Sequence, residues 1–98
     1  MVVLPAYVFY FCECLEKAAL ELGFNSKMAF YMSRFLILGS SSILEKSDQS
    51  SEYLRKRVTS PRGTTEAAIK VLLKGKRFEK IIRKAIFAAR SRAKKLSK

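Results

Sequence analysis

The sequence has no histidine, no tryptophan and only four glycines among its 98 residues, and these gaps exclude several kinds of chemistry. Without histidine the chain cannot build a Ser-His-Asp or Cys-His nucleophile system or a His-ligated metal site. The glycines are Gly23, Gly39, Gly63 and Gly75, a spacing that cannot form the Gly-x-Gly-x-x-Gly turn that seats a dinucleotide pyrophosphate. We therefore expect that the chain holds no metal and no cofactor by itself.

The cysteines are also few, and both lie in one apolar run. Cys12 and Cys14 stand two residues apart, which on a helix places them on different sides and too far apart for a disulfide. We interpret them as reduced core residues rather than as a redox or metal pair. No basic segment precedes the apolar start and no small-residue cleavage site follows it, so the sequence predicts a cytoplasmic protein without a secretory signal.

Charge is divided unevenly along the chain, whose net charge is +12. Residues 1–49 carry 4 bases and 5 acids, whereas residues 50–98 carry 16 bases and 3 acids. This asymmetry indicates either an anionic partner or a basic outer face on an assembly.

Periodic apolar residues and helix breakers predict an all-α fold, a bundle of about five helices. The first helix begins near Pro5 and runs to Leu22, with Gly23 as its stop. Asn25 or Ser26 caps a second helix that includes residues 28–44. We find no alternating pattern long enough for a strand, and Arg34, Ser33 and the small residues 39–42 argue against a membrane span in the second helix.

Three further helices are expected in the basic half. A short helix covers Glu52–Val58 after a polar loop, and Thr64 or Thr65 caps another over Glu66–Lys74, which Gly75 ends. The last helix has an apolar face made of Phe78, Ile81, Ile82, Ala85, Ala89, Ala93 and Leu96. Its basic residues lie away from that face and comprise Lys80, Arg83, Lys84, Arg90 and Lys94.

The first two helices carry more apolar surface than so short a chain can cover. Along the first helix one apolar stripe is formed by Leu4, Val8, Phe11, Leu15, Ala18 and Leu22, yet its first turns are apolar on every side. A chain of this length hides only about 60% of the surface that its unfolded form exposes. We expect a second copy to interlock with the first, with Gly39 allowing close helix approach; a tight monomeric bundle is the alternative.

Residues 59–66 form the segment with the most site-like chemistry. Pro61 fixes one dihedral angle and Gly63 permits positive φ, so the chain can reverse and leave the first amides of the next helix pointing outward. Those amides and the neighbouring hydroxyls suit a small carboxylate or a phosphate. An ordinary capped turn is the other interpretation of this segment.

The same segment carries a resemblance to a known family. Residues 59–65, Thr-Ser-Pro-Arg-Gly-Thr-Thr, resemble the Ser-Pro-Gly-Gly-Thr-Thr signature near the C-terminus of pyrroline-5-carboxylate reductase, the oxidoreductase that completes proline biosynthesis. Residues 5–9 are similar to the family's Gly-Pro-Ala-Tyr helix start, Leu22-Gly23-Phe24 to its helix-helix turn, and Gly39 to the glycine of its second helix. Nearly the whole chain takes part in the resemblance.

The resemblance implies that residues 1–98 are the helical C-terminal dimerisation domain, a fragment in which the N-terminal Rossmann domain is absent. It implies a homodimer or higher oligomer, and NAD(P)H bound only through a separately encoded Rossmann subunit. The implied substrate-binding residues, which meet the carboxylate of the cyclic imine, are Ser60, Gly63, Thr64 and Thr65. The Thr65 hydroxyl, the implied catalytic group, would meet the ring nitrogen as hydride arrives at the neighbouring carbon.

Three departures from the family pattern favour a relic or a stand-alone assembly module, which we expect to be inactive alone because nothing in the chain can hold a nicotinamide cofactor. Arg62 stands where the family has a glycine, Val3-Leu4 replaces Ser-Gly, and Phe35-Leu36 replaces a Gln-Thr pair. A basic helical nucleic-acid-binding protein is the alternative function, but nucleic acid is not the favoured partner because no base-reading motif is visible and basic helix faces are usually solvated. Membrane attachment is not expected, since the last helix offers only Phe78 and Phe87 as aromatic anchors.

Overall fold

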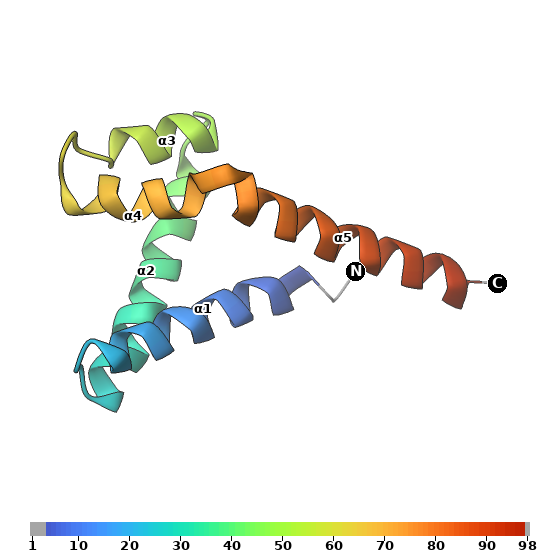
Figure 1. Cartoon of the computed structure of the whole chain (residues 1–98), viewed down its shortest axis with the longest axis horizontal. Coiled ribbons are helices and arrows are strands. Elements are labelled where there is room, and N and C mark those ends of the chain that lie inside the picture. The colour runs from blue at the N-terminus through green and yellow to red at the C-terminus, as the bar shows by residue number, and fades with distance from the viewer. Residues whose placement is uncertain (1–3, 98) are drawn as a thin grey trace. The chain divides into compact units, whose positions relative to one another are not determined.

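The computed structural model describes residues 4–97, with the backbone only for Leu4. Helices are the only regular structure in this range, which confirms the all-α prediction. They are α1 (Leu4–Glu21), α2 (Ser26–Lys46), α3 (Ser51–Arg57), α4 (Thr64–Leu73), the short 3-10 helix η1 (Lys74–Lys76) and α5 (Arg77–Leu96) (Figure 1). One unit contains α1 and α2, and a second unit contains the remaining helices.

A tight turn at Gly23 joins α1 to α2. Gly23 has φ +102°, its N–H donates to the carbonyl of Leu20 at 3.0 Å, and the Phe24 N–H donates to the carbonyl of Ala19 at 3.2 Å. These two bonds form a Schellman motif, which satisfies helix carbonyls that would otherwise have no partner. The predicted stop at Gly23 is confirmed.

The start of α2 is fixed by Asn25, one of the two caps that the sequence allowed. The Asn25 side-chain oxygen accepts a hydrogen bond from the Met28 N–H at 2.8 Å, which satisfies one of the unpaired amides of the first turn. Ala29 and Ser33 follow on one face of α2 and are buried, and the Ser33 hydroxyl donates to the carbonyl of Ala29 at 2.8 Å. Small residues therefore occupy the closely packed part of the α1–α2 unit.

The apolar stripe predicted along α1 is not the face that the chain itself covers. The half-buried residues of α1 include Cys12, Leu15 and Ala19, whereas Val8 and Leu22 are exposed. Because α1 is apolar nearly all round, its pattern alone could not select the buried face. Both cysteines are free, as expected, but Cys14 is exposed and so is not a core residue.

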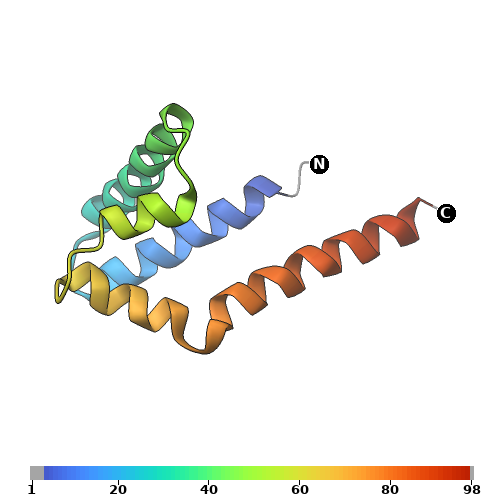
Figure 2. The same ribbon diagram turned by 90° about the horizontal axis from the view of Figure 1, so that it is seen from above.

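The second unit contains a sharp bend between α4 and α5. Gly75 has φ +62°, which confirms the predicted end of the fourth helix, and Lys76 also lies in the left-handed region at φ +54°. Two successive left-handed residues cannot continue a right-handed helix, so α5 starts in a new direction at Arg77 (Figure 2). Across residues 4–97, none of the helices combines the length and hydropathy that a membrane crossing requires.

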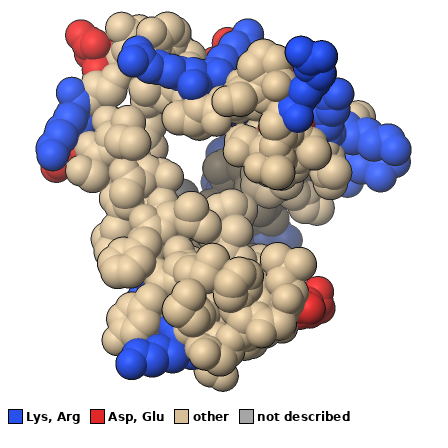
Figure 3. All heavy atoms as spheres, turned by 90° about the vertical axis from the view of Figure 1, so that its left-hand side faces the viewer, with Lys and Arg blue, Asp and Glu red and all other residues tan. Residues whose placement is uncertain are grey.

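Very little apolar surface is buried within the chain. Among the described residues, Ala29 is the one buried hydrophobic residue, and no large side chain is fully buried. Figure 3 shows Lys and Arg side chains projecting from a surface that is otherwise mainly uncharged. The helices are thus well formed locally but have almost no core of their own.

Candidate functional site

The loop between α3 and α4 is a hydrogen-bonded β-turn. The Gly63 N–H donates to the carbonyl of Ser60 at 3.1 Å, with Pro61 and Arg62 as the two central residues. Arg62 has φ +63°, as the third residue of a type II turn requires. Proline at the second position has the φ value that this turn needs.

The prediction that Gly63 supplies the positive φ is wrong. Gly63 is extended, with φ −88° and ψ 178°, and the left-handed conformation belongs to Arg62. The physical reason for glycine at position 63 is space, since a Cβ there would lie 3.3 Å from the carbonyl oxygen of Ser60. Arg62 therefore occupies the position where a residue without a Cβ has the lower conformational energy.

The helix start also differs from the prediction in its cap. Thr64 is already the first residue of α4 and Gly63 is its N-cap, so neither Thr64 nor Thr65 caps the helix with its side chain. Instead the Glu66 Oε1 atom accepts a hydrogen bond from the Arg62 N–H at 2.9 Å. Glu66 thus links the turn to the first turn of α4, where a negative charge is favourable.

The first amides of α4 are available to an acceptor from outside the chain. Within residues 4–97, the N–H groups of Thr64 and Thr65 donate to no protein atom, whereas the Gly63 N–H is used by the turn. Both threonine side chains are exposed, as is that of Ser60. The loop therefore brings Ser60, Thr64 and Thr65 together beside a helix start, which carries partial positive charge.

A hollow of about 250 Å³ lies within the second unit between α3 and α4, a feature that the sequence interpretation missed. It is lined by Arg55, Lys56, Thr59, Glu66, Ile69, Lys70 and Leu73. The Thr59 hydroxyl donates to the carbonyl of Arg55 at 2.6 Å, and Lys70 Nζ lies 3.9 Å from Glu66 Oε1. The spacing of Glu66, Ile69, Lys70 and Leu73 along one face of α4 was the available signal.

Charge pairing at α3 affects one carboxyl group. Lys56 Nζ lies 3.0 Å from Glu52 Oε2. The hydrogen bond from Lys56 lowers the pKa of Glu52, and the charges of Lys56 and Arg55 lower it further. Because both partners of this pair are well exposed, it contributes little to stability.

The described residues do not fit a metal ion or a dinucleotide. No group of three His, Cys, Asp or Glu side chains within residues 4–97 is arranged to hold a metal ion. The same range contains no β-strand, and a dinucleotide-binding turn needs a strand that leads through closely spaced glycines into a helix. Residues 59–66 offer a helix start at which the Thr64 and Thr65 amides have no partner among the described residues.

The chain is thus all-helical, and most of its large apolar residues are exposed. Its proline-containing turn leads directly into the start of α4. Residues 2–96 match the family described as pyrroline-5-carboxylate reductase dimerisation, and the chain belongs to that family. This confirms the resemblance that residues 59–65 carry.

Individual relatives agree with this assignment. The chain is 40% identical over 78 residues to pyrroline-5-carboxylate reductase 2 of Bacillus subtilis (strain 168), covering 80% of this chain and 28% of that protein. It is 36% identical over 94 residues to the pyrroline-5-carboxylate reductase of Staphylococcus haemolyticus (strain JCSC1435), covering 96% of this chain and 34% of that one. A solved structure of a pyrroline-5-carboxylate reductase from Coxiella burnetii matches with a TM-score of 0.91 and 43% identity, covering 98% of this chain and 35% of that chain.

The chain spans about a third of the length of these relatives. The shared part is the helical one described above, and it includes the Thr59–Thr65 loop. Of the departures noted in the sequence, Arg62 lies in the described loop. Phe35 and Leu36 lie exposed on α2. Val3 and the side chain of Leu4 lie outside the described residues.

Proposed function

We propose that residues 1–98 act as a dimerisation domain of the pyrroline-5-carboxylate reductase type, in which two copies cover each other's apolar surfaces. The observation that carries this proposal is the near absence of buried apolar side chains in a chain that is 49% hydrophobic. Burying one large apolar side chain contributes about 1.5–3 kcal/mol. A single copy forgoes most of that stabilisation, and a second copy is the simplest source of cover.

Helix α2 offers a ready contact surface for this pairing. Tyr31 and Phe35 stack on each other with ring centroids 6.3 Å apart, and Phe30 meets Tyr31 edge-on at 5.2 Å. Phe35 is nevertheless 67% exposed. Further along α2, no atom lies within 4 Å of the place where a Cβ of Gly39 would stand, so another helix can approach there closely. A self-complementary contact of this kind produces a closed dimer, on which larger rings can be built.

The Thr59–Thr65 loop gives this domain a second role as part of a substrate site. The free amides of Thr64 and Thr65 and the nearby hydroxyls suit the carboxylate of a small cyclic imine, and the family resemblance supports a contact between the Thr65 hydroxyl and the imine nitrogen. Because the chain's residues do not fit NAD(P)H, the domain is inactive alone. Reduction requires the cofactor to be held by a Rossmann domain.

The dimer is tested by a charge introduced at its proposed contact surface. Phe35→Glu replaces the exposed ring that stacks on Tyr31 by a carboxylate. Light scattering after gel filtration is expected to show a shift from dimer to monomer. Lys27→Glu is the matched control, because it puts the same side chain on a residue of α2 that is already charged. Equal masses for Phe35→Glu and the unaltered chain would contradict the proposed contact.

The substrate site is tested by mixing the chain with a Rossmann subunit and following NADPH oxidation with pyrroline-5-carboxylate. No turnover is expected from the chain alone, and turnover is expected from the mixture. Thr65→Val, which removes the hydroxyl but keeps the side-chain shape, is expected to lower that turnover. Ser97→Ala, a hydroxyl loss at the far end of α5, is the control. Inactivity of the mixture would count against the substrate role and leave the dimer unaffected.

A further inference from the structure

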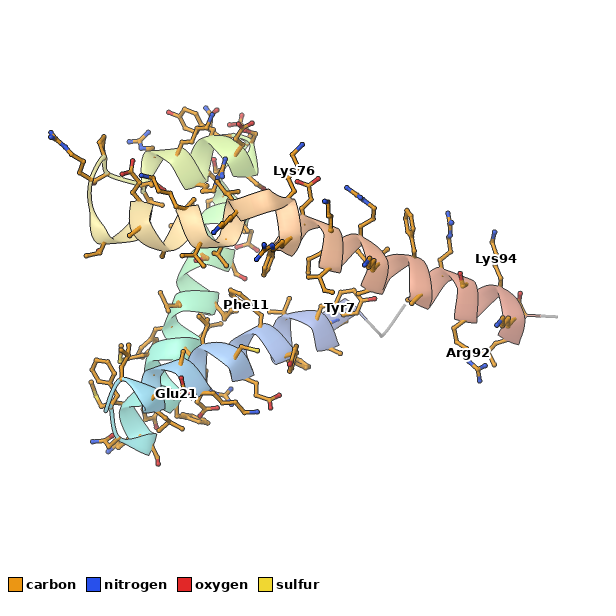
Figure 4. All side chains as sticks on the ribbon, viewed as in Figure 1. Tyr7, Phe11, Glu21, Lys76, Arg92 and Lys94 are labelled. Carbon is orange, nitrogen blue, oxygen red and sulfur yellow. The ribbon has the colours of Figure 1, made fainter. Side chains whose placement is uncertain are left out.

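The outer face of α5 carries a line of cations with an aromatic ring at its centre. Lys80, Arg83 or Lys84, Phe87, Arg90 and Lys94 recur at spacings of three or four residues, so they follow one side of the helix. In Figure 4 the Lys94 side chain projects from one side of α5 and Arg92 from the other. Phe87 lies seven residues before Lys94 and thus belongs to the Lys94 side, away from the apolar residues Phe78, Ala85 and Ala89.

We propose that this face, defined as Lys80, Arg83, Lys84, Phe87, Arg90 and Lys94, binds single-stranded nucleic acid, with phosphates on the cations and a base stacked on the Phe87 ring. This role goes beyond the dimerisation and substrate functions proposed above.

Phe87 is the aromatic side chain of this face. The side chain is 50% exposed, and the Arg90 guanidinium lies 5.0 Å from the ring centroid. An exposed ring next to an arginine provides a platform for an unpaired base, and stacking of this kind tolerates any base sequence.

The charges on the face are largely uncompensated. Within residues 4–97, the ion pairs of α5 are limited to Arg83 with Glu79, whose Nη2 and Oε2 atoms lie 3.3 Å apart. From Lys80 to Lys94 the face is about 21 Å long at about 1.5 Å per residue, enough for a site of roughly four nucleotides or more. The described cations are thus spread along a line, as a flexible phosphate backbone would need them.

A single strand fits this face better than a duplex or a membrane. Base stacking on Phe87 needs an unpaired base, which a duplex does not offer. A membrane-surface helix would insert its apolar face, here rich in alanine, and keep its cations at the rim. In α5 the exposed ring instead stands among the cations, opposite that apolar face.

Fluorescence anisotropy with a labelled oligothymidylate about 20 nucleotides long tests the proposal, with the whole chain as the protein. We expect binding whose affinity falls with salt, with a slope of log affinity against log salt of about −3 to −4 for five phosphate contacts. A duplex of the same length is expected to bind more weakly at equal salt. Phe87→Leu keeps helix propensity and removes the ring, and it is expected to weaken single-strand binding by roughly tenfold. Phe87→Tyr keeps a ring and is expected to retain binding.

Two sets of charge variants distinguish an effect of this face of α5 from an effect of the net charge of the chain. Lys80→Gln, Lys84→Gln and Lys94→Gln together are expected to flatten the salt slope by about 2. The control removes the same charge elsewhere, with Lys17→Gln, Lys27→Gln and Lys46→Gln. Circular dichroism verifies that both triple variants keep their helices. Three results would each overturn the proposal. They are an equal loss of oligonucleotide affinity in the two triple variants, full affinity in Phe87→Leu, and binding to phosphatidylserine vesicles without binding to the oligonucleotide.

Discussion

Arg62 shows how a single residue can depart from its family's pattern and still keep the local geometry. The turn from Ser60 to Gly63 needs a left-handed third residue, and Arg62 adopts φ +63° there although it carries a Cβ. The hydrogen bond from its N–H to Glu66 Oε1 helps hold that conformation. The sequence indicated that an arginine had replaced a glycine, but the positive φ was predicted at Gly63, because glycine adopts that conformation without steric cost.

Replacing Arg62 by glycine is expected to stabilise the protein. The left-handed conformation costs a residue with a Cβ about 1–2 kcal/mol, and the extra freedom of glycine in the unfolded chain offsets part of that gain. Arg62→Gly is therefore expected to raise the free energy of unfolding by up to about 1 kcal/mol in urea titrations at a fixed protein concentration. Arg62→Ala keeps the Cβ and should bring no such gain. A gain of the same size in Arg62→Ala would show that the guanidinium, not the backbone, is responsible.

Glu52 offers a test of local electrostatics. Its hydrogen bond with Lys56 lowers the pKa of Glu52 in the folded chain below that in the unfolded chain. The contribution of this pair to stability is therefore fully present above the ordinary glutamate pKa of about 4.3 and is lost as pH falls through the folded value. In an NMR titration, Lys56→Gln is expected to raise the pKa of Glu52, while Lys70→Gln should leave it unchanged. An unaltered Glu52 titration in Lys56→Gln would refute the pairing.

The start of α2 is a helix end for which the sequence offered two caps, Asn25 and Ser26, and one of them is observed. The structure assigns the cap to Asn25, whose side chain accepts from the Met28 N–H. Asn25→Ala is expected to lower the free energy of unfolding by about 1 kcal/mol, and Asn25→Asp should restore most of it. Ser26→Ala, one residue into the helix, should cost clearly less in the same urea titrations. The reverse order of the two alanine variants would assign the cap to Ser26.

Helices were predictable here where strong breakers separate them. Gly23 and Gly75 end helices as predicted, and Pro61 lies in the loop between α3 and α4. The buried face of α1 was not predictable, because periodicity selects a face only when the other faces are polar. The hollow between α3 and α4 was missed for a different reason: the spacing of residues along α4 marks one face of that helix, but the hollow exists only because α3 also lines it.

The substrate-binding role that the resemblance implies for Ser60, Gly63, Thr64 and Thr65 stays a prediction, and the structure adds the local geometry of these residues. The resemblance located Ser60, Gly63, Thr64 and Thr65, and the structure groups them in one turn and one helix start. Local hydrogen bonding decided the rest, since the Gly63 amide serves the turn and Glu66 takes part in capping. Such choices depend on distances of a few tenths of an ångström, which residue types alone do not determine.

For the complete chain, the main feature is the mismatch between its apolar composition and its single buried hydrophobic residue, Ala29, within residues 4–97. The sequence predicted this need for a partner from chain length and apolar content. Isolated helices with so small a core are marginal in water, because most helix stability comes from tertiary packing. We therefore expect the folding of the chain to be coupled to its association with a second copy.

Sedimentation equilibrium of the unaltered chain, run from micromolar down to nanomolar concentration with circular dichroism on the same samples, tests this most directly. We predict a mass of twice 11.2 kDa or a higher multiple at the upper end, with helix content falling as the chains dissociate. A mass of 11.2 kDa with full helix content throughout would contradict the account, because one copy would then be stable with its apolar faces in water.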